Sequence, residues 1–433
     1  FFPIDPGANA AIGGMASTSA SGTMAVKYGT MKTVITGLTV VMPTGDIINT
    51  GGRTKKTSAG YNLTNLFIGS EGTLGIITEV QLRLSPIPES IMSAVCHFPS
   101  LEKAVQTAQQ VIQYGVPIAR IEMLNKDQMG ISINYSKLTN VEETPTLFFE
   151  FHGTELSNNE NIKIVEEISK DNDGSSFKWA KDLEERNKLW RARWDVYYSV
   201  KALINNGRVY STDVCLPISN ITECVNYAEE QAKKFGLRAP MVGHLGDGNF
   251  HVLLPFDPEK KETYKKIREF NDLLIKKTLE LNGTITGEHG VGLHKKEYLL
   301  KEHGDNIPVM KLIKKDSVIE VLKQCFDPEL PVDLWNLGLI YDIQIQEAYN
   351  EQQSDINIVM SLTTPGCTMG EQIAQDIKNK LESNNEVNQV FVEVTFDPPW
   401  EPGMMSAEAR KKLGVGLNNA QESKETKINT DWE

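Results

Sequence analysis

The chain has 433 residues, of which 40% are apolar, and this is enough to bury more than one hydrophobic core. No stretch approaches the roughly 18 apolar residues of a membrane-spanning helix, and residues 1–6 lack the basic and apolar regions of a secretion signal. The five scattered cysteines form no CxxC pair and indicate reduced thiols, not a disulfide framework. We therefore expect an intracellular, water-soluble protein of the cytoplasm or of a mitochondrion-like compartment, with no membrane span.

The net charge of −13 lies entirely in one part of the chain. Residues 316–433 contain 21 acidic and 8 basic residues, whereas residues 1–315 contain 36 of each. This asymmetry indicates two modules of different origin. Neither module carries a basic run, so nucleic acid is not expected as a partner.

The order of the predicted elements supports this division. Residues 1–88 are rich in small residues and valine, with strand-like runs at 34–42 and 75–84. Residues 89–315 predict an α+β domain with an antiparallel sheet, because helical periodicity at 101–114, 158–169 and 181–203 alternates with strands at 118–123, 146–151 and 212–216.

A small α/β domain is predicted at residues 316–415. Its elements are a helix at 317–326, two strands of which the second is at 356–363, a helix at 369–383 and a strand at 389–396. Residues 416–433 contain almost nothing apolar and predict a disordered tail.

The strongest local signal lies at residues 243–251, with the sequence GHLGDGNFH. Asp247-Gly248 is typical of a two-residue hairpin turn, which would place His244 directly opposite His251 on one face of the ribbon. Two imidazoles in register suit a shared metal ion. The alternative interpretation is that each is a half-buried strand histidine with an ordinary hydrogen bond.

A second candidate segment is residues 286–292, with the sequence TGEHGVG. Glu288 beside His289 would complete a ligand set of two histidines and one carboxylate that leaves positions open for a substrate, and a neighbouring histidine near neutral pKa can act as a base. The alternative is a helix entry near Leu293, with Glu288 as a capping residue.

Residues 6–22 are almost all small. Such a run lets backbone N–H groups and hydroxyls approach a flat or phosphate-bearing ligand closely. By itself the pattern is weak, because stretches of Gly, Ala and Ser are more often loops or linkers.

Together with the sequence GSEGTLGI at residues 69–76, these segments resemble the flavin-binding and C-terminal domains of the vanillyl-alcohol-oxidase-type FAD family. The likeness is greatest to the D-lactate and glycolate dehydrogenases and their D-2-hydroxyglutarate relatives, and it covers residues 1–315. It implies a partial FAD-binding domain at 1–88 and an antiparallel-sheet domain for substrate and metal at 89–315.

The resemblance also assigns roles to single residues. His244, His251 and Glu288 match ligands of a divalent metal, zinc or alternatively manganese, which polarises the substrate hydroxyl. His289 matches the base that takes the hydroxyl proton as hydride leaves for FAD, and Arg193 matches the clamp for the substrate carboxylate. The residues implied to line FAD are Gly13, Gly14, Ser17, Thr18, Ser19, Gly22, Glu71, Gly72, Ile76 and Asn249.

Two departures from the family bear on function. Relatives that oxidise dicarboxylic hydroxyacids carry a cation two residues before Asp213, where this chain has Ser211. A second substrate carboxylate would then be desolvated without a partner, so we expect a short substrate such as D-lactate, with an electron acceptor that the sequence does not identify. The family's N-terminal lobe, which grips the FAD pyrophosphate, has no counterpart ahead of Phe1, so we expect a truncated chain that binds FAD poorly.

The second module resembles the SufT/PaaD-like domain of iron–sulfur cluster assembly factors. The carriers of this resemblance are the sequences DPELPV at 327–332, LGLIY at 337–341, TTPGCTMG at 363–370 and FDPPW at 396–400. Cys367 stands at the start of the predicted helix, where the helix dipole lowers a thiol pKa, so it is the candidate for transient binding of an iron–sulfur cluster. The alternative is a small buried cysteine, and Cys325 is assigned to helix packing.

A lone cysteine cannot hold such a cluster, which needs four thiolates, so a client protein or a second copy of the chain would supply the rest. Two further functions therefore stand beside the FAD- and metal-dependent oxidation of a D-2-hydroxyacid. One is an assembly or carrier protein that acts through residues 316–415, and the other is an inactive fusion of two truncated reading frames.

Overall fold

The structure is a computed structural model that describes residues 1–7, 9–43, 45–139, 141–328, 330–348, 353–364, 369–384 and 387–415. The chain folds as two compact units. The first comprises Phe1–Met42 and Asp46–Asp305, and the second comprises Pro43–Gly45 and the chain from Asn306 onward. Helix α13 (Ile307–Leu322) runs through the module boundary that the sequence places at residue 315, so the predicted domain limits stay predictions.

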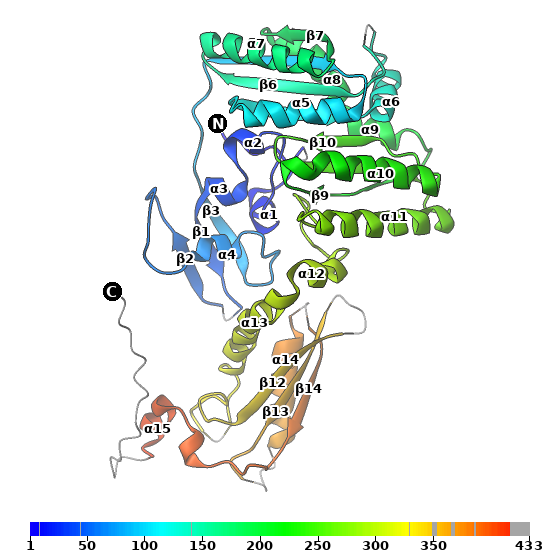
Figure 1. Cartoon of the computed structure of the whole chain (residues 1–433). Coiled ribbons are helices and arrows are strands. Elements are labelled where there is room, and N and C mark those ends of the chain that lie inside the picture. Colours follow the sequence, from blue (N-terminus) through cyan, green and yellow to red (C-terminus); the bar gives the residue numbers. More distant parts are fainter. Residues whose placement is uncertain are drawn as a thin grey trace. The chain divides into compact units, whose positions relative to one another are not determined.

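A small lobe opens the first unit (Figure 1). Its three-stranded antiparallel sheet has β1 (Ile35–Val41) in the centre, between β2 (Ile47–Gly51) and β3 (Ile76–Leu82). The short helices α1 (Ile12–Ser17) and α3 (Met31–Val34) pack on this sheet and share its apolar core. The strands predicted at 34–42 and 75–84 agree with β1 and β3.

Two further short helices, α2 (Ala25–Tyr28) and α4 (Leu63–Phe67), lie within the same stretch of sequence as the small lobe. All later elements of the first unit form a larger sheet and the helices around it. They are β4 (Ser90–His97), α5 (Leu101–Gln113), β5 (Ile118–Leu124), α6 (Lys126–Ser136), β6 (Thr146–Gly153), α7 (Glu155–Asp171), β7 (Ser175–Ala180), α8 (Leu183–Trp194), α9 (Val196–Lys201), β8 (Arg208–Ser211), β9 (Val214–Cys215), the 3-10 turn η1 (Ile218–Asn220), α10 (Ile221–Phe235), β10 (Met241–His244), β11 (Asn249–Phe256), α11 (Lys261–Glu280), α12 (Lys296–His303) and the 3-10 turn η2 (Gly304–Asn306).

The large sheet has eight strands in the order β7-β4-β6-β5-β10-β11-β8, with β9 paired to β11, and every neighbouring pair is antiparallel. Successive side chains of its strands enter two different cores. Phe149 packs among residues of α5, α7, α10 and α11, whereas Phe148 contacts Trp190 of α8 in a second core shared with α6 and α9. The predicted α+β architecture with an antiparallel sheet is therefore confirmed.

One predicted helix of this domain needs correction. The periodicity at 181–203 predicts a single helix, but the structure has α8 and α9, separated at Asp195. Asp195 ends the first helix and begins the second, and its carboxylate accepts a hydrogen bond from the hydroxyl of Ser136. The backbone of Asp195 leaves the helical region, with φ −84° and ψ 3°, and this interrupts the helix at that one residue.

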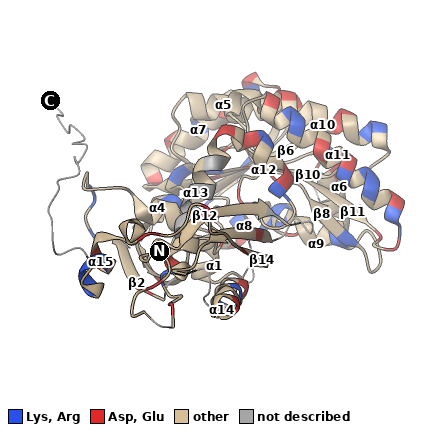
Figure 2. Cartoon of the chain, turned by 90° about the horizontal axis from the view of Figure 1, so that it is seen from below, with Lys and Arg blue, Asp and Glu red and all other residues tan. Residues whose placement is uncertain are grey.

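The charges on the outer helices of the first unit are mixed in sign. Figure 2 shows acidic and basic residues interspersed along the ribbons of α10 and α11. This pattern is typical of solvated helix faces, and it agrees with the zero net charge of residues 1–315.

The second unit contains a three-stranded sheet with the order β12-β13-β14. Strands β12 (Ile340–Glu347) and β13 (Ser354–Met360) are antiparallel, whereas β14 (Val387–Val394) runs parallel to β13 after the crossover helix α14 (Gly370–Glu382). The predicted order of helix, two strands, helix and strand is confirmed. The unit closes with η3 (Pro402–Met404) and α15 (Ala407–Leu413), and the predicted disordered tail at 416–433 lies outside the described residues.

Among the residues that the structure describes, no helix combines the length and the apolar character needed to cross a membrane.

A buried polar cluster joins β5 to β6. Oε1 of Glu150 lies 3.4 Å from Nε of Arg120 and 2.8 Å from Nε2 of His152. Burial by itself raises the pKa of Glu150, but the hydrogen bond from His152 and the charge of Arg120 outweigh burial and hold the pKa below its usual value of 4.5. The carboxylate therefore stabilises the fold above about pH 4.5, and this contribution is lost as pH falls through the lower pKa of the folded state.

Replacing Glu150 with Gln should lower the free energy of unfolding by about 2–3 kcal/mol at neutral pH, because Arg120 and His152 lose their charged partner. The difference from the unmodified protein should stay constant above about pH 5 and shrink below about pH 4, where the native carboxylate takes up a proton. Denaturant unfolding at several pH values measures this difference in the free energy of unfolding. Glu166→Gln, at an exposed helix pair, is the control and should change nothing, whereas a difference that grows on acidification would contradict the assignment.

Candidate active site

The hairpin of β10 and β11 brings the two predicted histidines to one face, in a register that differs from the prediction. His244 pairs with Asn249 and His251 pairs with Val242, so the histidines are diagonal neighbours and not direct partners. Their ring centroids are 5.5 Å apart. The predicted two-residue turn is wrong because Leu245 is buried in the large core and its N–H donates to a carbonyl of β5, which lengthens the turn to four residues.

The carboxylate of Glu288 lies against both imidazoles. Its Oε1 is 3.0 Å from Nε2 of His251 and 3.5 Å from Nε2 of His244, and its Oε2 accepts a hydrogen bond of 3.1 Å from the hydroxyl of Ser21. One ligand atom from each of the three predicted metal ligands lies within 4.8 Å of the others. Helix α12 begins only at Lys296, so Glu288 stands in a loop and does not cap a helix.

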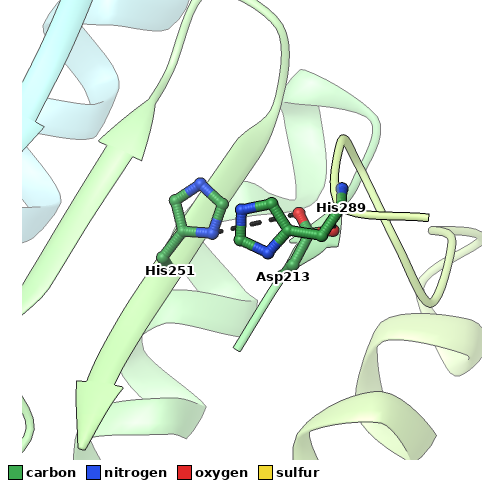
Figure 3. A group of neighbouring side chains, drawn as sticks. All are labelled: Asp213, His251 and His289. Carbon is green, nitrogen blue, oxygen red and sulfur yellow. Dashed lines mark hydrogen bonds and ion pairs between the residues drawn. The ribbon is translucent and has the colours of Figure 1, made fainter. Parts of the chain in front are cut away.

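A second group of possible ligands overlaps the first. Figure 3 shows Asp213, His251 and His289 turned toward one another, and the two imidazoles stack with centroids 5.1 Å apart and an interplanar angle of 12°. Nδ1 of His251 donates to the carbonyl of Thr212 at 2.8 Å and therefore carries a proton. Nδ1 is the His251 nitrogen that lies 3.9 Å from Asp213, and its proton occupies it, whereas Nε2 faces Glu288 and is the nitrogen that can bind a cation.

Asp213 is almost completely buried and holds the loop that carries Glu288 and His289. Its carboxylate accepts hydrogen bonds from the hydroxyl of Thr286, from the backbone N–H groups of Glu288 and His289, from the amide of Asn249 and from the ammonium of Lys295. Burial by itself raises the pKa of Asp213, but the positive charges of His251 and Lys295 outweigh burial and hold the pKa well below its ordinary value.

The electrostatic field of the site favours positive charge between the carboxylates. Burial by itself lowers the pKa of His244, but Glu122 and Glu288 more than offset burial and raise the pKa to about 10. The histidines in turn hold the pKa of Glu288 far below its ordinary value, although burial opposes them. Burial lowers the pKa of His289, so this imidazole is neutral at physiological pH and can accept a proton.

Arg193, the predicted carboxylate clamp, is bound to a partner that the sequence did not reveal. Its Nε and Nη2 both lie 2.7 Å from Oε2 of Glu122, whose Oε1 accepts from Nδ1 of His244 at 2.7 Å. Arg193 is largely buried and is not the solvated helix residue of the alternative interpretation. Its role toward a substrate stays a prediction.

The predicted FAD-lining segments also meet in this part of the first unit. The N–H of Gly69 donates to the carbonyl of Ala16 at 3.0 Å, and the N–H of Glu71 donates to Ser17 at 2.9 Å. The carboxylate of Glu71 accepts from the N–H groups of Val291 and Gly292, so it also supports the loop that carries Glu288 and His289. Gly13, Gly14 and Ser17 lie in α1, Thr18, Ser19 and Gly22 follow it, Glu71 and Gly72 lie in the turn before β3, and Ile76 begins β3.

Two features fit a flavin bound against these segments. Oδ1 of Asn249 is buried and has no hydrogen-bond partner among the described residues, although its Nδ2 is bound to Asp213. Ile76 is 68% exposed and offers an apolar contact for a ring. Gly287 packs against the Asn249 amide so closely that a Cβ there would come within 2.0 Å of Nδ2, which leaves no room for a side chain at residue 287. An unsatisfied buried amide oxygen is costly, so it indicates a ligand N–H.

Sequence reasoning missed the supporting residues Glu122 and Lys295 and the central role of Asp213. Glu122 has a weak signal, because it is an acidic residue inside an apolar strand, where a charge requires a partner. Lys295 has no such signal. The candidate Cys367 of the second module lies outside the described residues.

Three family models match the chain. The model described as "FAD linked oxidases, C-terminal domain" matches residues 87–329, which is more than half of the chain, and the model described as "FAD binding domain" matches residues 1–51. The chain therefore belongs to the FAD-linked oxidase family, as its motifs predicted. Residues 315–394 match the family described as "Iron-sulfur cluster assembly protein".

Several of the similar individual proteins are named D-lactate dehydrogenase. The chain is 48% identical over 318 residues to the probable mitochondrial D-lactate dehydrogenase of Danio rerio, covering 72% of this chain and 64% of that protein. It is 41% identical over 316 residues to the mitochondrial D-lactate dehydrogenase (cytochrome) of Arabidopsis thaliana, covering 73% and 56%. The chain thus spans about three fifths of the length of these relatives.

One solved structure has a fold similar to that of this chain. Alkyldihydroxyacetonephosphate synthase aligns with a TM-score of 0.53 at 18% identity, covering 74% of this chain and 58% of that one.

Replacing Asp213 with Asn should lower the free energy of unfolding by about 3–5 kcal/mol, because the buried ammonium of Lys295 loses its charged partner. The loop should also open more often, so the amides of Glu288 and His289 should exchange hydrogen faster. Denaturant unfolding and amide exchange measure the two effects. Asp257→Asn, at an exposed turn, is the control, and unchanged exchange at Glu288 and His289 in the Asp213 variant would contradict the assignment.

Proposed function

We propose that the first unit oxidises a short D-2-hydroxyacid such as D-lactate to the 2-oxoacid, with FAD as the hydride acceptor and a divalent cation at His244, His251 and Glu288. The observation that carries this proposal is the convergence of two Nε2 atoms and one carboxylate oxygen within 4.8 Å of one another. The relatives named D-lactate dehydrogenase support the choice of substrate.

The donor set suits zinc, with manganese as the alternative. Two neutral imidazoles and one carboxylate are the ligands of catalytic zinc sites, and such sites leave coordination positions for the substrate. The other nitrogen of each imidazole donates to the protein, His244 to Glu122 and His251 to Thr212, as is usual for metal-bound histidines. A bound cation would supply Lewis acidity to the α-hydroxyl and carboxylate of the substrate.

Residues of the chain itself position the substrate and take its proton. Nε2 of His289 lies 3.6 Å from Oε1 of Glu288 and so faces the cation site, where it would accept the proton of the substrate hydroxyl. Arg193 would bind the substrate carboxylate, and Asn249 would hold the flavin through its unpartnered Oδ1. Bound FAD would supply the hydride acceptor.

Ser211 supports a monocarboxylate over a dicarboxylate. It ends β8, and its hydroxyl donates to the carbonyl of Thr212, so it offers no positive charge two residues before Asp213. A distal carboxylate would lose its hydration there without an ionic partner.

The experiment combines the purified chain with FAD, Zn²⁺ or Mn²⁺ and D-lactate and follows the loss of the oxidised-flavin absorption band. We expect bleaching with D-lactate and none with L-lactate. His251→Ala and Glu288→Gln should each abolish cation binding, measured as cation retained after gel filtration, and should slow bleaching by at least about 100-fold. Lys233→Ala, on the outer helix α10, is the control. Flavin that stays oxidised in the unmodified chain would overturn the proposal.

A second candidate function rests on the match of residues 315–394 to the iron–sulfur cluster assembly family. We infer that the second unit handles iron or an iron–sulfur cluster through Cys367, together with thiolates from a client protein or from another copy of the chain.

Cys367→Ser should reduce the iron and sulfide bound by the intact chain after anaerobic reconstitution, because the serine hydroxyl does not replace a thiolate ligand. Cys325→Ser is the matched control: Cys325 is fully buried in the core of the second unit, and burial raises its pKa to about 12, so it should not bind a cluster. Equal iron contents in the Cys367 variant and the unmodified protein would contradict this function.

A further inference from the structure

Glu122 is a fully buried carboxylate in the middle of the large sheet. It stands on β5 directly opposite His244 of β10, with which it forms a cross-strand pair. Its carboxylate lies between His244 on one side and Arg193 of α8 on the other. The charge of Glu122 is therefore neutralised by the two residues that the proposed function uses for the cation and for the substrate carboxylate.

Both neighbours of Glu122 are hydrogen-bond donors. Oε1 accepts the Nδ1 proton of His244, so Nε2 is the ring nitrogen that faces Glu288 and the candidate cation site. Oε2 accepts from Nε and Nη2 of Arg193. Only an ionised carboxylate accepts from both neighbours at once, because an amide must turn its own NH₂ group toward one of them.

The same contact orients the guanidinium of Arg193. The edge formed by Nε and Nη2 is occupied by Glu122, and Nη1 has no protein partner among the residues that the structure describes. A guanidinium fixed along one edge presents its other edge in a defined plane, which suits a planar carboxylate.

We propose that Glu122 is a positioning residue that sets the tautomer of His244 and the plane of Arg193 together, so that one buried carboxylate aligns the cation ligand with the substrate clamp. This inference rests on the proposed function of the first unit. It goes beyond that function because Glu122 itself contacts neither the cation nor the substrate.

The test is Glu122→Gln in the intact chain. The affinity for Zn²⁺ or Mn²⁺, measured by calorimetric titration without FAD or substrate, should fall roughly 10- to 100-fold, as for other residues that orient metal-bound histidines. KM for D-lactate should rise as well, because Arg193 loses its fixed orientation.

Glu150→Gln is the matched control, since Glu150 is also a buried carboxylate between a histidine and an arginine of the same sheet, but it lies away from the candidate ligands. It should lose stability yet keep the cation affinity of the unmodified protein. An affinity in Glu122→Gln within about twofold of this control would overturn the inference.

Two further measurements separate this inference from the proposed function. If His251→Ala leaves cation affinity unchanged, the proposed cation site itself fails. If His251→Ala abolishes binding while Glu122→Gln retains it, only the inference about Glu122 fails. In the cation-loaded unmodified protein, ¹⁵N shifts of the His244 ring should show a protonated Nδ1 and a cation-bound Nε2, and the opposite tautomer would overturn the inference even if the variant does not fold.

Discussion

The burial of the Glu288 carboxylate between two imidazoles is the interaction on which the polar centre of the first unit depends. A charge removed from water is costly unless partners surround it, and here His244, His251 and Ser21 supply them. Glu122 and the Thr212 carbonyl accept the Nδ1 protons of the two rings, so both Nε2 atoms are held facing Glu288.

Two further carboxylates, those of Asp213 and Glu71, hold the loop of Glu288 and His289 in place. Asp213 collects the backbone N–H groups of residues 288 and 289 and so fixes the loop, and Glu71 does the same for residues 291 and 292. Hydrogen bonds therefore anchor the loop to both the large sheet and the small lobe. Its conformation is set by side chains from distant segments, which explains how a stretch without regular secondary structure holds its residues in place.

The sequence predicted features that depend on residues close together in the chain, and it missed contacts between residues that only the fold brings together. The residue types of His244, His251 and Glu288 indicated the candidate cation site, and the apolar pattern located β5, β6 and β9 of the large sheet but not β4, β7 or β8. The hairpin register was wrong because the burial of Leu245, a tertiary effect, overrides the preference of Asp247-Gly248 for a two-residue turn. Glu122 escaped notice because its partners stand about 70 and 120 residues away in the chain, and no spacing rule connects them.

The crowding at Gly287 has a consequence for how such a site can diversify. Because any side chain at residue 287 would collide with the Asn249 amide, this position beside Asp213 accepts only glycine. Ser211, two residues before Asp213, is only partly buried and its hydroxyl bonds only to the adjacent backbone carbonyl, so a substitution there removes no contact with the loop of Glu288. The two sides of Asp213 therefore differ in the substitutions that they can accept.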